Sequence, residues 1–403
     1  MTLARTIHDW LSELPEDQFR RLKAVEPESS GMVRWADGRS LVDFASNDYL
    51  GLSHHPELIN RANQWMQAWG TGARASRLIS GNFPALVELE QKLAHAKNTE
   101  SALIFGSGFQ VNSSILAALL SRKLQKKSSI HVFTDRLCHA SFHFGLSAAG
   151  VRQNRFRHNN FGHLEEMLQS KRPPGEPALI ATESVFSMEG DRLNVREIRS
   201  LAAKYGALLY VDEAHATGLY GPQGMGLLSD SQGMEETEFG GHDEVVIGTF
   251  GKALGSFGAY VACSREIRDY LVNACAGLIY STGLPPAVLG CIDAALDLVP
   301  AMNDERSHLN RLSLHLRQSL QAMGLDTLHS ETQIIPVVLG DNDRVLKVSQ
   351  RLLDAGFLVG AIRPPTVPSG SARLRISLSA AHKVAQVDAF VAAMQEFTEE
   401  ANA

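Results

Sequence analysis

The chain has 403 residues, of which 44% are hydrophobic and 20% are charged, a composition typical of a folded protein and not of a disordered one. Its 38 basic and 44 acidic residues give a net charge of −6, which argues against a protein that coats nucleic acid or an anionic membrane. Its apolar runs fall far short of the roughly 18 residues that a membrane-spanning helix needs.

Two stretches near the N-terminus have apolar residues at helical spacing. These residues are Ile7, Trp10, Leu11 and Leu14 in the first stretch, and Leu86, Leu89 and Leu93, after Pro84, in the second. Between them, "LVDFASNDYLGL" predicts an irregular segment with a turn at residues 46–48. No signal-peptide core is visible at the N-terminus and the four cysteines form no CxxC pair, so we expect a cytoplasmic protein.

The central part of the chain alternates short apolar runs with helix-compatible stretches. The runs cover residues 102–108, 131–139, 178–187, 207–215, 245–252 and 258–264. Near-continuous apolar strands that alternate with helices indicate an α/β fold with a mostly parallel sheet covered on both faces. Because ligands bind beyond the carboxyl ends of such strands, we expect the polar residues after each run to converge on one site.

The C-terminal part predicts a second, smaller α/β unit. A long helical stretch (roughly 285–324) precedes an apolar run at 333–340, a helix, and "RLRISLS", whose alternation puts Arg373, Arg375 and Ser377 on one face. We therefore expect three parts: an N-terminal arm and helix (1–55), a large ligand-binding domain (56–285) and a small C-terminal domain (286–403).

Lys252 lies in the glycine-rich turn "TFGKALG", directly after an apolar run. Small neighbours would let a planar ligand approach the backbone, and desolvation would make the amine a nucleophile able to form an imine. A surface lysine in a glycine turn is the alternative. A phosphate-binding P-loop is excluded, because its required glycine and Ser/Thr positions hold Val246 and Ala253.

Asp212, Glu213 and His215 end another apolar run in "VDEAH". These letters also occur in the metal-binding box of nucleic-acid helicases, but such a box needs a P-loop and none is present. A strand-end Asp could instead pair with a protonated ring nitrogen, with His215 near another edge of the same ring. An Asp that caps the following helix is the alternative.

Two further strand ends carry candidate ligand contacts. "FGSGFQVN" places Gly108 and Phe109 at a strand-to-helix turn, where backbone N–H groups bind phosphate, although a plain turn explains the pattern equally well. His139 in "DRLCHAS" could stack on a planar cofactor. His139 and His143 lack a third ligand, so we expect no metal site.

In this order, the motifs resemble those of the α-oxoamine synthases, which are fold-type-I pyridoxal-phosphate enzymes. The similarity covers nearly the whole chain. It is carried by "SNDYLGLSHHPEL", "RLISGN", "GSGFQVN", "DRLCHAS", "ESVFSMEGD", "VDEAHATG", "TFGKALG", "IYSTGLPP" and "AIRPPTVPSGSARLRISLSAAH". The resemblance implies a large domain with a mostly parallel sheet, a smaller C-terminal α/β domain, pyridoxal 5'-phosphate as cofactor, and a homodimer in which two subunits build each site.

The resemblance also implies roles for individual residues. Lys252 matches the imine-forming lysine, Asp212 the partner of the pyridine nitrogen, and His215 the residue at the phenolic oxygen. His139 matches the residue that stacks on the cofactor ring and contacts substrate. The remaining matches are the cofactor contacts Gly108, Phe109, Ser187 and Thr249 and the substrate contacts Arg21, Asn47, Thr366 and Arg375.

The "RPPTVPSG" turn favours the family member that condenses L-alanine with a pimeloyl thioester, on CoA or on a carrier protein, in biotin biosynthesis. A sister synthase that uses glycine or serine with another acyl-CoA is the alternative. Neither reading implies a nucleic-acid or membrane partner. The polar segment 229–244 is longer than is usual in the family, and we expect it to alter only a surface loop.

Overall fold

The computed structural model describes residues 2–16, 18–230 and 244–402. The chain forms two compact units, and each is described here by itself. The larger unit comprises residues 47–187 and 191–308, and the smaller comprises residues 1–46, 188–190 and 309–403. The three parts expected from the sequence, with boundaries at 55 and 285, stay a prediction.

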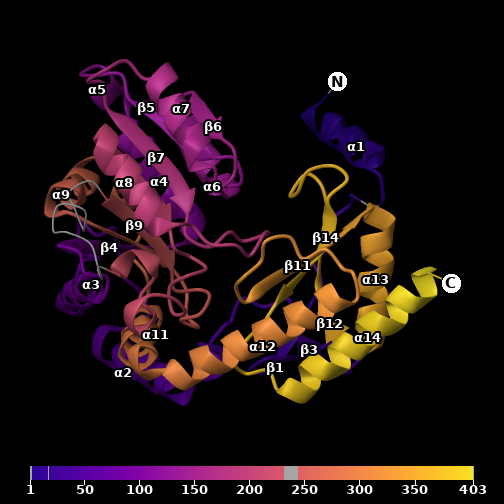
Figure 1. Cartoon of the computed structure of the whole chain (residues 1–403). Coiled ribbons are helices and arrows are strands. Elements are labelled where there is room, and N and C mark those ends of the chain that lie inside the picture. The colour runs from indigo at the N-terminus through magenta and orange to yellow at the C-terminus, as the bar shows by residue number, and fades with distance from the viewer. Residues whose placement is uncertain (1, 17, 231–243, 403) are drawn as a thin grey trace. The chain divides into compact units, whose positions relative to one another are not determined.

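The larger unit is built on a seven-stranded sheet with the order β4-β10-β9-β8-β7-β5-β6 (Figure 1). Its strands are β4 (Ser101–Phe105), β5 (His131–Asp135), β6 (Gln153–Phe156), β7 (Ala178–Glu183), β8 (Ala207–Asp212), β9 (Glu244–Thr249) and β10 (Ala259–Cys263). Strands β5 to β9 pair in parallel, and β10 runs antiparallel to β4 and β9. The prediction of an α/β fold with a mostly parallel sheet is confirmed.

The larger unit also contains ten helices within the described residues. They are α2 (Pro56–Trp69), α3 (Pro84–Ala96), α4 (Gly108–Leu119), α5 (Arg122–Gln125), α6 (Ala140–Ala149), α7 (Phe161–Lys171), α8 (Val195–Tyr205), α9 (Arg265–Ala274), α10 (Ala276–Ile279) and α11 (Pro286–Leu298), with short 3₁₀ turns at Leu52–His54, Pro222–Gly224, Leu227–Ser229 and Val299–Ala301. Of these helices, α3, α4, α7, α8 and α9 contact the strands of this sheet. The predicted helix after Pro84 is confirmed, with its three leucines buried.

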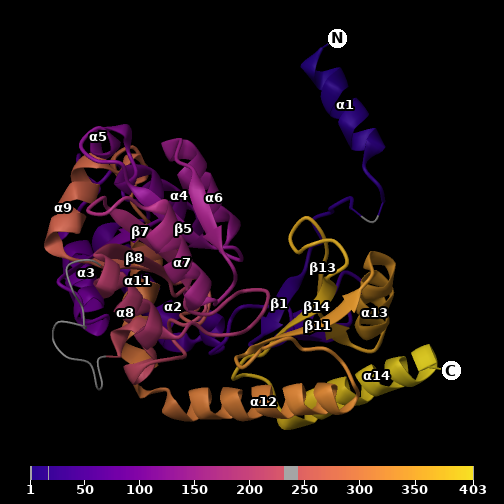
Figure 2. The ribbon, with the colours of Figure 1, turned by 45° about the horizontal axis from the view of Figure 1, so that its top comes forward.

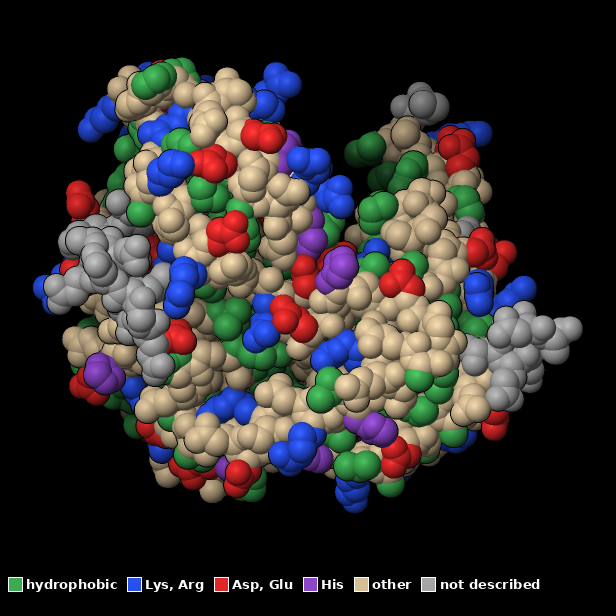
Figure 3. All heavy atoms as spheres, viewed as in Figure 1, with side chains coloured by type: hydrophobic (Ala, Val, Ile, Leu, Met, Phe, Trp, Pro, Cys, Tyr) green, Lys and Arg blue, Asp and Glu red, His purple; other side chains and the backbone are tan. Residues whose placement is uncertain are grey.

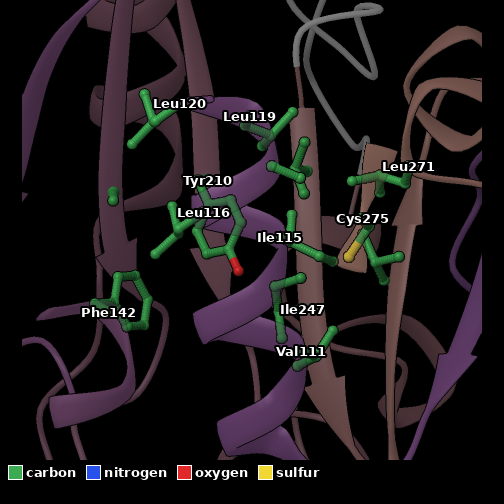
Figure 4. Close-up of a cluster of buried hydrophobic side chains, with 14 of the residues drawn as sticks. Val111, Ile115, Leu116, Leu119, Leu120, Phe142, Tyr210, Ile247, Leu271 and Cys275 are labelled. Carbon is green, nitrogen blue, oxygen red and sulfur yellow. The ribbon is translucent and has the colours of Figure 1, made fainter. Parts of the chain in front are cut away.

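The core of this unit lies between α4 and the sheet (Figure 4). Val111 and Ile115 of α4 are buried in one cluster with Tyr210 of β8 and Ile247 of β9. Residues of β8 on the opposite face are buried as well, which explains why this strand has a continuous apolar sequence and no alternation. The cluster fixes α4 over the carboxyl ends of β8 and β9, where the candidate site lies.

The smaller unit has two sheets. The first has the order β1 (Glu26–Ser29), β2 (Met32–Arg34), β3 (Ser40–Asp43) and β12 (Phe357–Leu358), and the second has the order β11 (Ile334–Gly340), β14 (Ala372–Ser377) and β13 (Gly360–Ile362). Its helices are α1 (Leu3–Glu13), α13 (Asn342–Asp354), α14 (Val384–Asn402) and most of α12 (Asn303–Ala322). Helices α12 and α14 lie side by side in Figures 1 and 2, and His315 forms an ion pair with Asp388 between them.

Three local expectations from the sequence were wrong or incomplete. The helical stretch at 285–324 is broken near Pro300, because a proline in a helix interior removes a hydrogen bond and clashes with the preceding turn. The irregular segment expected before residue 46 contains β3, which pairs in parallel with β12 from the far end of the chain. The alternation that puts Arg373 and Arg375 of β14 on one face did not tell whether that face is exposed, and both side chains are buried.

Two surface features bear on the expectations about partners. Acidic and basic side chains are interspersed over the face shown in Figure 3. Within the described ranges, no single helix has the length and hydropathy to cross a membrane, although the pair Pro286–Ala301 and Asn303–Ala322, bent by 75°, meets the same criteria jointly.

Candidate active site

Asp212 is the last residue of β8 and lies beside Glu183, the last residue of β7. Both carboxylates are buried at the carboxyl end of the sheet. One oxygen of Asp212 accepts a hydrogen bond from the backbone N–H of Ala214 (2.8 Å), and the other accepts one from the side-chain amide of Asn112 (2.7 Å). The first bond lies within a turn, so the alternative of an Asp that caps a following helix does not match the structure here. The second bond directs the other oxygen to the N-terminal part of α4.

Asn112 connects several groups of the site, although no pattern in the sequence singled it out. Its amide nitrogen also donates to the hydroxyl of Ser141 (3.1 Å), and its oxygen accepts from the hydroxyl of Tyr210 (2.7 Å). Its side chain is 1% exposed. Because all these partners are polar groups away from water, the amide holds Asp212 in one orientation.

His139 caps the N-terminus of α6. Its backbone N–H donates to the carboxylate of Glu183 (2.5 Å), and its Nδ1 accepts from the backbone N–H and the hydroxyl of Ser141 (3.3 and 2.8 Å). Desolvation lowers the pKa of His139, the Lys252 cation acts in the same direction, and Asp212 opposes them. The ring is therefore neutral near pH 7, with its proton on Nε2 and part of its surface open to solvent.

Lys252 lies in the turn after β9, closed by a hydrogen bond from the N–H of Gly255 to its carbonyl (2.9 Å). Its Nζ lies 2.7 Å from Nε2 of His215. On the other side of that ring, Nδ1 lies 2.7 Å from the hydroxyl of Tyr49, which donates to Oδ1 of Asn47 (2.9 Å). The structure thus links two predicted catalytic or cofactor residues to a predicted substrate residue through Tyr49, which sequence reasoning missed.

The glycines around Lys252 have different roles. A Cβ on Gly248 would lie 2.3 Å from the ring of Tyr260, and one on Gly255 would lie 2.5 Å from the backbone of Leu52, so both allow close packing inside the protein. At Gly251 the nearest neighbour of such a Cβ would be 3.6 Å away, an ordinary van der Waals distance. Gly108 has nothing within 4 Å of such a Cβ. There is therefore open space for the expected approach of a ligand to the backbone at Gly108.

Thr249 ends β9. Its hydroxyl donates to the carbonyl of Gly258 (2.8 Å) and accepts from the N–H of Gly251 (3.2 Å). The hydroxyl therefore fixes the turn that carries Lys252. Phe109, next to Gly108, is exposed and packs edge-to-face on Phe144 (5.1 Å between ring centroids).

His158 joins the loops that carry His139 and Ser187. Its Nδ1 lies 3.1 Å from both oxygens of Asp135, at the end of β5, and its Nε2 lies 2.8 Å from Asp191. Asp191 closes the turn around the half-buried Ser187, since its carbonyl accepts from the N–H of Phe186 (3.1 Å). Burial alone would lower the pKa of His158, but the hydrogen bonds to the two carboxylates outweigh it and raise the pKa to about 10.

Glu213 follows Asp212 and forms a buried ion pair with Lys97. The two side chains are 0% and 1% exposed, and the other oxygen of Glu213 accepts from the N–H of Leu228 (2.9 Å). Desolvation opposes the charge on Lys97, but Glu213 more than compensates and raises the lysine's pKa. Glu213 is thus part of the support of the Asp212–His215 turn. Over residues 2–16, 18–230 and 244–402, no group of three or more His, Cys, Asp or Glu could hold a metal ion.

The other predicted substrate residues belong to the smaller unit. Arg375 is buried in β14 between β11 and β13 and donates to the hydroxyl of Ser377 (2.7 Å). Its neighbour Arg373 donates to the carboxylate of Glu189 (3.0 Å) and the carbonyl of Met188 (3.2 Å). Arg373 therefore holds the 188–190 segment within this unit.

Thr366 and Arg21 line one cavity of about 810 Å³ in the smaller unit. Arg20, not Arg21, donates to the hydroxyl of Thr366 (3.4 Å), whereas Arg21 pairs with Glu16 (2.9 Å) on the surface. Arg363 also lines this cavity, so its walls carry several cations. The segment 231–243, most of the polar stretch singled out in the sequence, lies outside the described residues.

Comparisons with known proteins agree on one family. A model of the aminotransferase class I and II family matches residues 39–394. The 8-amino-7-oxononanoate synthase of Gluconacetobacter diazotrophicus is 50% identical over 97% of this chain and 96% of its own length. A structure of SPT (serine palmitoyltransferase) with PLP (pyridoxal 5'-phosphate) superimposes on this chain with a TM-score of 0.85 at 28% identity, over 99% of this chain and 96% of the other. The 8-amino-7-oxononanoate synthase of Francisella tularensis gives 0.75 at 25% identity, over 90% and 98%.

Proposed function

The chain belongs to the 8-amino-7-oxononanoate synthases, within the aminotransferase class I and II family, and we propose that it joins L-alanine to a pimeloyl thioester. The products are 8-amino-7-oxononanoate, carbon dioxide and the free thiol of CoA or a carrier protein. The chain is a pyridoxal-phosphate-dependent acyltransferase of biotin biosynthesis. The single observation that carries the proposal is the buried Asp212 carboxylate in the same unit as a lysine amine bonded to His215.

The residues present fit pyridoxal phosphate. Asp212 supplies a buried carboxylate for the pyridine nitrogen, Lys252 an amine for the aldehyde carbon, and His215 a ring nitrogen for the phenolic oxygen. Open space at Gly108 leaves the backbone N–H groups of Gly108 and Phe109, at the start of α4, accessible to a phosphate. Thr249 and Ser187 complete the proposed cofactor contacts.

When bound, this cofactor supplies an electron-withdrawing ring that stabilises negative charge at the α-carbon of the amino acid. The residues of the chain hold and move protons around it. Nζ of Lys252 takes the α-proton of alanine and later returns a proton to the product, because a neutral amine can act as base and then as acid. The hydrogen bond from Asn112 holds the carboxylate of Asp212 in one orientation. His139 would stack on one face of the cofactor ring when the cofactor is bound.

The substrates need partners for their carboxylates. We assign the carboxylate of alanine, or the ketone product, to Arg375 and Asn47, since an arginine fork matches a carboxylate with two hydrogen bonds. We assign the acyl thioester to Arg21 and Thr366, whose cavity carries basic walls. We also assign a substrate contact to His139.

We also propose a homodimer. Several large apolar side chains of the larger unit are exposed in the single chain, among them Phe109, Phe144, Phe257 and Tyr280. Exposed apolar side chains in such number are typical of a protein–protein interface. A cytoplasmic location stays a prediction; it agrees with the four unpaired cysteines.

The proposed function is tested by adding pyridoxal phosphate, reducing with borohydride and mapping the modified peptide. The expected label is on Lys252, and its absence there would refute the assignment. A second experiment measures turnover of alanine, glycine and serine, each with pimeloyl-CoA, pimeloyl-carrier protein and longer acyl thioesters.

A sister synthase that acts on glycine or serine is the second candidate, favoured by the structural similarity to SPT. Faster turnover with serine or glycine than with alanine would select this candidate. Faster turnover with alanine and a pimeloyl thioester supports the first.

A further inference from the structure

Four polar groups of the larger unit form one continuous chain of hydrogen bonds: Lys252 Nζ, the two ring nitrogens of His215, the hydroxyl of Tyr49 and Oδ1 of Asn47. The distances along it are 2.7, 2.7 and 2.9 Å, which are all ordinary hydrogen-bond lengths. Tyr49 is 0% exposed and His215 is 6% exposed, so the middle of this chain is shielded from water.

The single hydroxyl hydrogen of Tyr49 fixes the direction of these bonds. The oxygen of the Asn47 amide can only accept, so the hydroxyl of Tyr49 donates to it. The short contact between Tyr49 and His215 is then a hydrogen bond only if Nδ1 of His215 carries the proton and donates. Nε2 of a neutral His215 is consequently unprotonated and accepts from the amine of Lys252.

We propose that Tyr49 is a positioning residue, which holds His215 with its proton on Nδ1 and thereby keeps Nε2 as a partner for Lys252. Through Tyr49 and His215, the protonation of Lys252 depends on Asn47, which is far from Lys252 in the sequence but is joined to it by this chain of hydrogen bonds. The link to alanine binding rests on the proposed function, because it is that function which puts the carboxylate at Asn47. The hydrogen-bond direction itself does not depend on it.

Removing either the hydroxyl of Tyr49 or its acceptor, the amide of Asn47, should change which nitrogen of His215 carries the proton. Tyr49→Phe deletes one oxygen and leaves the ring that packs near His215. Asn47→Ala keeps Tyr49 but frees its hydroxyl to donate to Nδ1 of His215. In both variants a proton moves onto Nε2 in part of the molecules, so Nε2 becomes a poorer partner for a protonated amine.

The test measures how fast Lys252 reacts with acetic anhydride at different pH values in protein without pyridoxal phosphate, by mass spectrometry of its peptide. We expect half-maximal labelling of Lys252 at a pH lower by about 0.5 to 1 unit in both variants. Tyr270→Phe is the matched control, because it also removes a tyrosine hydroxyl that donates to another group, the carbonyl of Ala118 (2.7 Å), within the same unit. Its profile should equal that of the unchanged protein.

Unchanged profiles in both variants would overturn the proposal. So would a shift in Tyr49→Phe alone, because it would show that the hydroxyl of Tyr49 acts on His215 without the direction that Asn47 imposes on it. Labelling of cofactor-free protein does not depend on turnover, so the result stands apart from any failure of the alanine assay.

Discussion

The side-chain amide of Asn112 lies 2.7 Å from the carboxylate of Asp212, and both side chains are buried. The same amide holds the hydroxyl of Ser141, which in turn contacts His139. One residue of α4 therefore orients the groups proposed to lie at the nitrogen and on the face of the cofactor ring. This arrangement makes Asn112 the first residue to test.

Asn112→Ala should weaken the protein and its hold on pyridoxal phosphate together. The change removes the side-chain donor to one oxygen of the buried Asp212 carboxylate, which costs on the order of 1 to 3 kcal/mol in free energy of unfolding. We expect about tenfold weaker binding of pyridoxal phosphate, measured by absorbance titration alongside urea unfolding. Asn273→Ala, which removes an exposed amide bonded to the carbonyl of Asp269, is the control and should leave both quantities unchanged. Equal cofactor affinity in Asn112→Ala would contradict the role given to Asn112.

His158 should stabilise the fold in a pH-dependent manner. Its pKa is about 10 in the folded protein, against roughly 6.5 for an exposed histidine, because Asp135 and Asp191 favour its charged form. A raised folded-state pKa gives stability that is fully present below about pH 6.5 and is lost as the pH rises through about 10. The free energy of unfolding of His158→Gln should therefore fall below that of the unchanged protein by a few kcal/mol at pH 6 and by much less near pH 10.

The comparison is made by urea unfolding at each pH. His315→Gln is the control, since its ion pair with Asp388 is exposed and contributes about 1 kcal/mol or less. A difference for His158→Gln that stays constant from pH 6 to pH 10 would show that the charge of His158 is not what stabilises the fold.

The buried pair of Lys97 and Glu213 should show strong coupling. Lys97→Met leaves the carboxylate of Glu213 buried without its cation and should cost about 3 to 5 kcal/mol. The double variant Lys97→Met with Glu213→Gln should cost clearly less than the two single changes added together, because no uncompensated charge remains. A double-mutant cycle from urea unfolding measures this coupling, and additive costs would argue against it.

Arg375→Ala should raise the KM for alanine on the order of 10- to 100-fold, because a hydrogen-bonded carboxylate loses a charged donor. Steady-state kinetics with varied alanine and saturating pimeloyl thioester give this value. Arg344→Ala, at an exposed position on α13, is the control and should leave the KM unchanged. An unaltered KM in Arg375→Ala would remove this residue from the carboxylate role.

The sequence was informative where a strand ended in a chemically distinctive residue. Asp212 and Thr249 are the last residues of β8 and β9, and Lys252 and His215 follow within three residues, so the topology of a parallel sheet was enough to expect these groups together. Hydrophobic runs in the sequence likewise marked most strands of the large sheet, because both faces of these strands are buried.

The supporting residues could not be predicted in the same way. Asn112 lies inside a helix, and Tyr49 lies among apolar residues of the sequence. Their roles follow only from hydrogen bonds to Asp212 and His215, which are far from them in the sequence. Both residues belong to motifs that the sequence analysis quoted, Asn112 to "GSGFQVN" and Tyr49 to "SNDYLGL". Within those motifs, nothing distinguished them from the glycines and from Asn47, to which roles were assigned. The buried state of Arg373 depended on Glu189, nearly half the chain away, and strand alternation carries no information about such a partner.

The pairing of β3 with β12 has a consequence for biosynthesis. Residues 40–43 emerge early from the ribosome, yet the strand beside them, Phe357–Leu358, is made only near the end of translation. The first sheet of the smaller unit therefore cannot be completed until almost all of the polypeptide has been synthesised, whereas the seven strands of the larger sheet are complete by Cys263. Until β12 is synthesised, the edge of β3 that will pair with it has no partner strand. Because an unpaired strand edge can pair with another chain, a chaperone could bind β1–β3 during that interval.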